Sequence, residues 1–251
     1  KDYDYAVVCV GELPSTERPG DIYALDLAKE QQEIVKSLSK TGIKIILVLV
    51  EGRPKIISEI EPLADAIIQC YLPGDQGGTA LADIIFGKIN PSGKLPYTYP
   101  RNSGVIMHYD HKQSELINGN TWKNDFFNPQ YKFGFGLSYT DYEYSNLVID
   151  KSSYSLSDEI NISVDIKNIG ERAGKEVVQL YARDHFATIS PALRRLVRYN
   201  KVALNPGEIK TVSFKISTEE LGFYNADNIW INEPGKHSFF VESLEASFSL
   251  K

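Results

Sequence analysis

The chain has 251 residues and a net charge of −6, and it is 42% hydrophobic and 24% charged, as ordinary globular proteins are. It carries no long basic run, so neither nucleic acid nor an anionic membrane is expected as a partner. The longest apolar run, Ile43–Val50, is too short to span a bilayer and contains Lys44. A chain of this length is expected to form two domains.

Three apolar runs in the first hundred residues predict strands at 5–10, 44–50 and 66–71. Each run is continuous rather than alternating, which indicates a strand buried on both faces. Helical patterns separate the runs, and alternation of strands and helices with short connections predicts right-handed crossovers and a parallel sheet. Three strands make a small sheet, so either further strands precede Lys1 in a parent protein or this domain packs on a partner.

The helical patterns have recognisable ends. Asp26 is the predicted N-cap of the first helix, and Gly42 follows its last turn. A shorter helix is predicted after Pro54, because Ile56, Ile57 and Ile60 share one side.

The stretch Leu72–Pro96 predicts a helix that opens at Gly77-Gly78 and stops at Gly87, followed by a turn and a final edge strand. Its glycines have two interpretations, a backbone anion nest or a tight turn between strand and helix, and the structural one is favoured. A nucleotide-binding fold is not supported, because the residues after the first strand are GELPSTE and no phosphate-binding glycine motif is present.

Polar residues follow the strands at the edge where ligands bind in parallel α/β sheets. The loop 11–25 is the longest and carries four charged residues: Glu12, Glu17, Arg18 and Asp21. Loop 51–55 carries Glu51 and Arg53, and loop 72–78 carries Asp75. These loops are the candidate site of any chemistry in the first domain.

Cysteine and histidine give no sign of a metal centre. Cys9 and Cys70 lie in predicted strands and are interpreted as buried free thiols. His108 and His111 stand three apart with Asp110 between them, but no further ligand completes a recognisable set. The sequence therefore predicts neither a metal nor a cofactor.

The rest of the chain changes character. Residues 102–142 are irregular and aromatic, and they predict a long bridging loop packed across a domain junction. Residues 143–251 alternate apolar and polar side chains and carry turns such as Asn205-Pro206-Gly207. Seven short strands of this kind predict an antiparallel β-sandwich. The predicted division is therefore a partial α/β domain at 1–101, the bridge, and the sandwich.

Several stretches resemble the family 3 glycoside hydrolases, the β-glucosidase and β-xylosidase group. They are LPGDQGGTALADIIFGKINPSGKLPYTYPR, YKFGFGLSYTDYEYSNL, VVQLYARD and VALNPGEIKTVSFKIS, in that order along the chain. In that family a barrel comes first, then an α/β sandwich domain, then often a fibronectin type III-like domain. The resemblance implies that this chain is the second half of the α/β sandwich plus the fibronectin-like domain.

The segment GELPSTERPGD resembles the family segment that carries the general acid/base, which implies this role for Glu17. Without the motif, Glu17 reads as an exposed loop carboxylate. Glu12 is expected to brace the loop, and Asp21 to orient it through local hydrogen bonds. Ser15-Thr16 is polar where the family often has an aromatic residue, so the resemblance does not indicate which sugar is the substrate.

The family nucleophile is an aspartate of the barrel, and no residue here lies in its motif context. The chain is therefore expected to be the C-terminal portion of a retaining β-glycosidase acting on terminal β-linked glucose or xylose, inactive without the barrel. Its partners would be a β-glucoside or oligosaccharide substrate and the barrel domain or chain. The alternative is a non-catalytic module for carbohydrate binding or assembly.

Overall fold

The computed structural model describes residues 3–15, 20–104, 108–112 and 128–251. Contacts group the chain into two compact units. Unit 1 comprises 1–89, 98–107 and 128–132, and unit 2 comprises 90–97, 108–127 and 133–251. Among the described residues, no helix has the length and apolar character needed to cross a membrane. The division at 101 and 142 stays a prediction.

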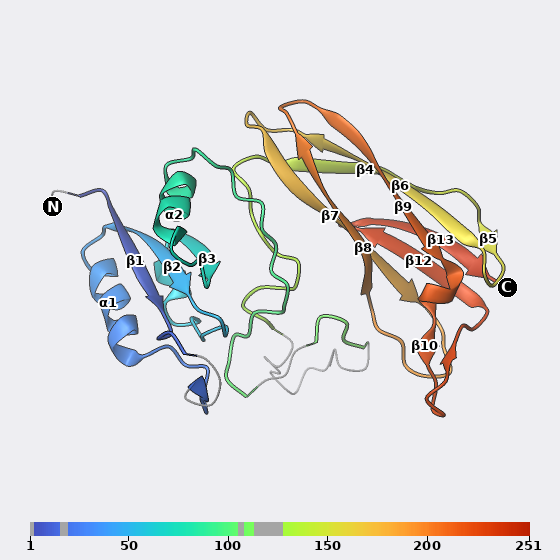
Figure 1. Ribbon diagram of the computed structural model, residues 1–251, viewed down its shortest axis with the longest axis horizontal. Coiled ribbons are helices and arrows are strands. Elements are labelled where there is room, and N and C mark those ends of the chain that lie inside the picture. Colours follow the sequence, from blue (N-terminus) through green and yellow to red (C-terminus); the bar gives the residue numbers. More distant parts are fainter. Residues whose placement is uncertain (1–2, 16–19, 105–107, 113–127) are drawn as a thin grey trace. The chain divides into compact units, whose positions relative to one another are not determined.

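Unit 1 contains the predicted parallel sheet, in the order β1 (Tyr5–Gly11), β2 (Lys44–Val50) and β3 (Ala66–Tyr71). Helix α1 (Lys29–Ser39) packs against β1 and β2 (Figure 1). Helix α2 (Gly77–Ile85) follows β3, beginning and ending where its glycines predict. The α/β fold class of the first domain is thus confirmed.

One face of β1 is open, against the prediction of a strand buried on both faces. Val8 and Val10 are buried, whereas Tyr5, Val7 and Cys9 on the other face are exposed. The prediction of a buried Cys9 is therefore wrong. A continuous apolar run does not distinguish a strand with two covered faces from one with a single covered face.

Other local predictions in unit 1 fail where tertiary pairing prevails. Asp26 is not an N-cap; it forms a bridge with Ile56, and α1 begins three residues later behind Ala28. The predicted short helix at 56–60 is instead that bridge and a turn before the 3-10 helix η2 (Glu61–Leu63). No edge strand follows α2 among the described residues up to Pro96. The backbone of Leu95 instead donates to Phe135 O and accepts from Gly134 N, each at 2.8 Å.

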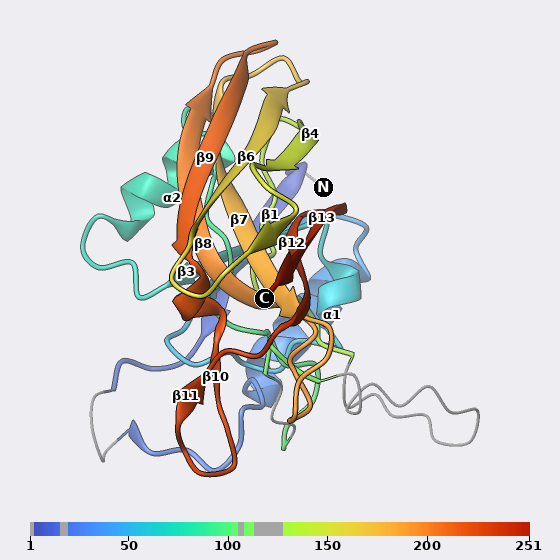
Figure 2. The same ribbon diagram turned by 90° about the vertical axis from the view of Figure 1, so that its right-hand side faces the viewer.

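Unit 2 is an antiparallel sandwich of two sheets (Figures 1 and 2). The three-stranded sheet has the order β4-β6-β9 and the five-stranded sheet the order β5-β13-β12-β7-β8, in which only the β13–β5 pair is parallel. The first sheet consists of β4 (Tyr142–Ile149), β6 (Glu159–Asn168) and β9 (Ile209–Ser217). The second consists of β5 (Ser153–Tyr154), β7 (Gly174–Asp184), β8 (Arg195–Leu204), β12 (Gly235–Val241) and β13 (Leu244–Leu250).

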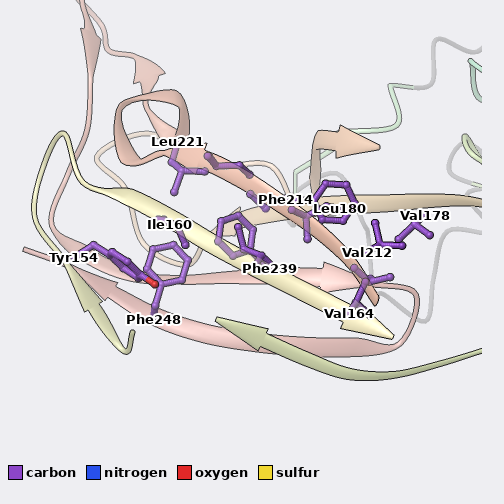
Figure 3. Packing of buried hydrophobic residues seen from close by; sticks show 14 of the residues in the cluster. Tyr154, Ile160, Val164, Val178, Leu180, Val212, Phe214, Leu221, Phe239 and Phe248 are labelled. Carbon is purple, nitrogen blue, oxygen red and sulfur yellow. The ribbon is translucent and has the colours of Figure 1, made fainter. Parts of the chain in front are cut away.

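The seven predicted sandwich strands are all present, and short elements are added to them. The 3-10 helix η5 (Thr218–Leu221) leads into a two-stranded ribbon of β10 (Phe223–Tyr224) and β11 (Trp230–Ile231), which extends from one end of the sandwich (Figure 2). Apolar side chains from both sheets fill the space between them, with Phe239 and Phe248 stacked at 5.1 Å between ring centroids (Figure 3).

Candidate functional site at the carboxyl edge of the parallel sheet

The ends of β1 and β2 meet closely at the edge where ligands bind in parallel sheets. Gly11 ends β1 with a φ of +152°, and a Cβ at this position would lie 1.9 Å from the Val50 carbonyl oxygen. Only glycine allows this approach. The Gln31 side chain of α1 then fixes the strand end, accepting from Gly11 N at 2.8 Å and donating to Gly11 O at 3.0 Å. Glu12 is thereby directed toward the loop after β2.

Glu12 and Arg53 form the first polar cluster at this edge. Glu12 Oε1 accepts from the backbone N–H groups of Gly52 and Arg53, each at 2.9 Å. Its Oε2 accepts from Arg53 Nε at 2.9 Å and Nη2 at 2.7 Å. Burial alone would raise the pKa of Glu12, but the hydrogen bonds from Arg53 and Gly52 outweigh it and hold the pKa below its usual value. Glu12 therefore braces the two loops as an ionised carboxylate.

Glu51 forms a second, buried cluster. Its side chain is fully buried, and its Oε1 lies 2.8 Å from the Tyr99 hydroxyl and 3.4 Å from Gln69 Nε2. Burial raises the pKa of Glu51, although the hydrogen bonds from Tyr99 and others oppose this. Its Oε2 is buried and has no hydrogen-bond partner among the described residues.

The Tyr99 hydroxyl links the Glu51 carboxyl to the backbone of Lys55. It lies 2.7 Å from the Lys55 carbonyl oxygen as well as 2.8 Å from Glu51 Oε1. A phenol has one hydrogen, which Tyr99 donates to Glu51 Oε1 or to the Lys55 carbonyl oxygen. The hydrogen bond to Glu51 opposes the rise in its pKa that burial causes.

Two basic side chains lie near the Glu12 carboxylate. Lys55 is buried, and its Nζ lies 3.8 Å from Glu12 Oε2. Two cations, Arg53 and Lys55, thus face the carboxylate of Glu12, while burial raises the pKa of Glu51.

The structure brings together some predicted site residues and leaves others apart. Glu12 pairs with Arg53 and Glu51 lies in the second, buried cluster, whereas Asp21 and Asp75 are exposed. Glu17 and Arg18, including the candidate general acid/base, lie outside the described residues. Within the described part of the chain, no group of three or more histidine, cysteine or acidic side chains is placed to hold a metal ion.

Sequence reasoning missed the contribution of Tyr99 and Lys55. Tyr99 belongs to a later segment of unit 1 and is 48 residues from Glu51, so no local pattern connects them. It is fully buried and contacts the Tyr131 ring edge-on at 5.9 Å, and Tyr131 in turn donates to Glu61 at 3.2 Å. The one sequence feature that could have indicated Tyr99 is the pair of tyrosines two residues apart, Tyr97 and Tyr99, after the turn.

The fold joins a parallel α/β unit with a polar carboxyl edge to an antiparallel β-sandwich. Residues 1–139 match the glycosyl hydrolase family 3 C-terminal domain, and residues 176–244 match the fibronectin type III-like domain. The chain therefore belongs to glycosyl hydrolase family 3. This confirms the resemblance seen in the sequence, including the fibronectin-like character of the sandwich.

Individual relatives agree with this assignment. A beta-xylosidase of Formosa agariphila is 35% identical over all of this chain, and a periplasmic beta-glucosidase of Salmonella typhimurium is 34% identical over 96% of it. The crystal structure of a beta-glucosidase from Listeria innocua in complex with glucose superposes with a TM-score of 0.91 at 30% identity over 99% of the chain. This chain spans 35%, 33% and 37% of these three proteins, and it matches their C-terminal part.

Proposed function

We propose that this chain is the C-terminal portion of a retaining β-glycosidase that releases terminal β-linked glucose or xylose, and that Glu17 is its general acid/base. The observation that carries the proposal is the position of Ser15 and Gly20, the described residues nearest to Glu17 on either side. Ser15 and Gly20 stand at the carboxyl edge of the parallel sheet, where both contact Arg53. A catalytic loop in an α/β fold is expected at this edge.

The proposed reaction has two steps. In the first, the Glu17 carboxylic acid gives its proton to the leaving glycosidic oxygen as the bond from that oxygen to C1 breaks and an aspartate bonds to C1. In the second, the Glu17 carboxylate takes a proton from water, whose oxygen bonds to C1 as the aspartate leaves. Both carboxyl groups return to their starting state.

The nucleophile is proposed to come from a barrel domain or chain. Retaining chemistry needs a second carboxylate about 5–5.5 Å from the first. Glu12 is engaged by Arg53, and Glu51 is fully buried with its Oε1 hydrogen-bonded, so neither is free to attack a sugar. We therefore propose that the chain is inactive by itself. Complexes of the Listeria innocua beta-glucosidase with glucose and, for a mutant, with laminaribiose support the substrate class.

The test is to co-express the chain with its barrel half and to compare two aryl β-glucosides. Glu17→Gln is expected to lower turnover of phenyl glucoside by about 10²–10⁴-fold, because its leaving group needs a proton. Turnover of 2,4-dinitrophenyl glucoside should fall far less in the bond-breaking step. Asp4→Asn, at an exposed carboxyl of unit 1 outside this loop, is the control. Equal turnover of phenyl glucoside by Glu17→Gln and the unmodified chain would refute the role of Glu17.

A second candidate function, carbohydrate binding without catalysis, is favoured by a hollow of about 370 Å³ in unit 2. Tyr142 and Tyr144 line it together with the carboxylates of Asp141 and Glu242. Aromatic rings with a few polar groups are typical of small-molecule sites. Its walls include a buried ion pair, Lys94 Nζ to Glu176 Oε1 at 2.9 Å, which keeps the hollow polar.

Calorimetry with gluco- and xylo-oligosaccharides separates the two candidates. Binding without catalysis predicts heat with the chain alone, and loss of that heat in Glu242→Gln. No heat at high sugar concentration, together with turnover restored by the barrel half, would remove this second candidate.

A further inference from the structure

Two aromatic rings are exposed together on the ribbon of β10 and β11. Tyr224 and Trp230 face each other across the two strands, with ring centroids 5.1 Å apart and an interplanar angle of 73°. Tyr224 is 59% exposed and Trp230 is 43% exposed, whereas the other cross-strand pair, Phe223 and Ile231, is half-buried. Since side chains alternate along a strand, the ribbon directs its two most exposed rings to one face. We call Tyr224 and Trp230 the aromatic pair.

The ring of Trp230 is held in place by its surroundings. Its Nε1 donates to the Glu219 carbonyl oxygen at 2.9 Å, and a Cβ placed on Gly222 would lie 2.7 Å from the same Nε1. The Arg195 guanidinium carbon lies 5.9 Å from the ring centroid, and Arg195 also donates to the Gly222 carbonyl oxygen at 3.0 Å. The indole N–H is thus satisfied within the chain, and the ring is oriented before any ligand binds. Such pre-organisation lowers the entropic cost of binding.

The turn that joins the two strands is also supported. Asn225 Oδ1 accepts from the backbone N–H groups of Asp227 at 3.0 Å and Ile229 at 2.9 Å. The backbone N–H of Asn225 donates to the Ile229 carbonyl oxygen at 3.0 Å. Asn228 has a φ of +60°, in the left-handed region that asparagine adopts more readily than most residues. The aromatic pair therefore stands on a closed hairpin rather than on a free loop.

The chemistry of the ribbon favours a neutral partner that is rich in hydroxyl groups. Segment 222–232 carries a single charged side chain, Asp227, and no basic one, so it offers no positive patch to an anionic polymer. In β-linked glucose and xylose the ring hydroxyls are equatorial, so both faces of the sugar ring carry only C–H groups and can stack on an aromatic face. The amide of Asn228 is exposed on the same ribbon, and an amide both donates to and accepts from hydroxyl groups.

We infer that the aromatic pair is a carbohydrate-binding site for chains of β-linked glucose or xylose. The sugar ring stacks on the aromatic rings, and its hydroxyls bond the amides of the turn and water. The inference rests on the substrate class of the proposed function, and it adds a second place where the chain contacts the polysaccharide. The pair binds sugar and takes no part in bond cleavage. Large aromatic rings exposed on a supported element are the usual anchors of recognition surfaces.

The experiment is affinity electrophoresis of the full chain in native gels that contain laminarin, a soluble β-linked glucan, or soluble xylan. The unmodified chain is expected to be retarded by at least one of the two polymers, relative to a gel without polysaccharide. Trp230→Ala should weaken this binding by at least about tenfold, because truncation of a central aromatic anchor removes most of the contact. Trp230→Phe keeps an aromatic face and should stay within about threefold of the unmodified chain.

Tyr199→Ala is the matched control. Tyr199 is a tyrosine of β8 that is 69% exposed and lies outside the ribbon, so its removal should leave the retardation unchanged. Circular dichroism checks that each variant is folded. If Trp230→Ala does not fold, Tyr224→Ala tests the same site from the opposite strand, and a comparable loss of binding is expected.

Three results would overturn the inference. The first is an unmodified chain that neither polymer retards, and the second is retardation that survives in both Trp230→Ala and Tyr224→Ala. The third is a dimer of the unmodified chain in gel filtration that Trp230→Ala dissociates, because the aromatic pair would then join two copies. The proposed function fails by a different measurement, equal turnover of phenyl glucoside by Glu17→Gln and the unmodified chain with the barrel half. Sugar binding by the aromatic pair and proton transfer by Glu17 are therefore tested separately.

Discussion

The central strand of one sandwich sheet and the first strand of the α/β unit bury alternate residues, yet their exposed faces differ in chemistry. In β6, Ile160, Ile162 and Val164 are buried and the opposite face is polar. In β1, the face opposite Val8 and Val10 is apolar and still exposed. The uncovered face of β6 in the sandwich therefore carries polar side chains that water can solvate. The uncovered face of β1 in the α/β unit instead carries apolar side chains of the kind usually found on a buried face.

The largest expected effect comes from a substitution that leaves a cavity in the core of the sandwich. Phe239→Ala removes a fully buried ring stacked on Phe248 and is expected to destabilise unit 2 by about 3–5 kcal/mol. Phe186→Ala, at a ring that is 78% exposed, is the matched control and should cost less than about 0.5 kcal/mol. Thermal denaturation measures both. Similar costs for the two variants would contradict the packing described for the sandwich.

Two adjacent valines test the open face. Val8→Ala removes buried methyl groups and is expected to cost about 1.5 kcal/mol, whereas Val7→Ala, on the face that is open, should cost little. Native-state hydrogen exchange of the β2 amides reports this for unit 1 alone. If Val7→Ala is as costly as Val8→Ala, the face bearing Val7 is covered in solution, and the contrast with the sandwich disappears.

The smallest expected effect depends on pH. The pKa of Glu51 is raised in the folded chain, so its stabilising contribution is complete below the unfolded pKa of about 4.3 and is lost as the pH rises through the folded pKa. Glu51→Gln, which resembles the protonated acid, should remove this loss and become relatively more stable with rising pH. Hydrogen exchange of the β2 amides at several pH values measures the change.

Asp4→Asn, at an exposed carboxyl in unit 1, is the control for Glu51→Gln and should leave the pH dependence unchanged. A Glu51→Gln variant whose stability follows pH in parallel with the unmodified chain would show that Glu51 does not titrate abnormally.

The sequence predicted best what local pattern decides. The strands of the sandwich follow a period of two between turn signals, and the limits of β2 and β3 coincide with their apolar runs. Asp26 shows the limit of such reasoning: it is a good N-cap type, but a bridge to Ile56 places it outside the helix. A residue 30 positions away decided its conformation, and no helical propensity encodes that.

The candidate site was predicted in part for the same reason. Glu12, Glu51 and Arg53 could be placed at one edge, because the loops that follow parallel strands all lie at the carboxyl edge of the sheet. Their pairing could not, since Glu12 binds Arg53 across 41 residues and Glu51 binds Tyr99 across 48. Glu17 stays a prediction, because its support is the family motif and it lies outside the described residues.

The two units are interleaved along the chain, since unit 1 takes back residues 98–107 and 128–132 after unit 2 has begun at Asn90. Asn90 itself belongs to the sandwich, where it accepts from Ser138 and donates to the Ala173 carbonyl oxygen. No single breakpoint in the gene can therefore separate the two units intact. A fragment cut at one position would therefore carry residues of both units.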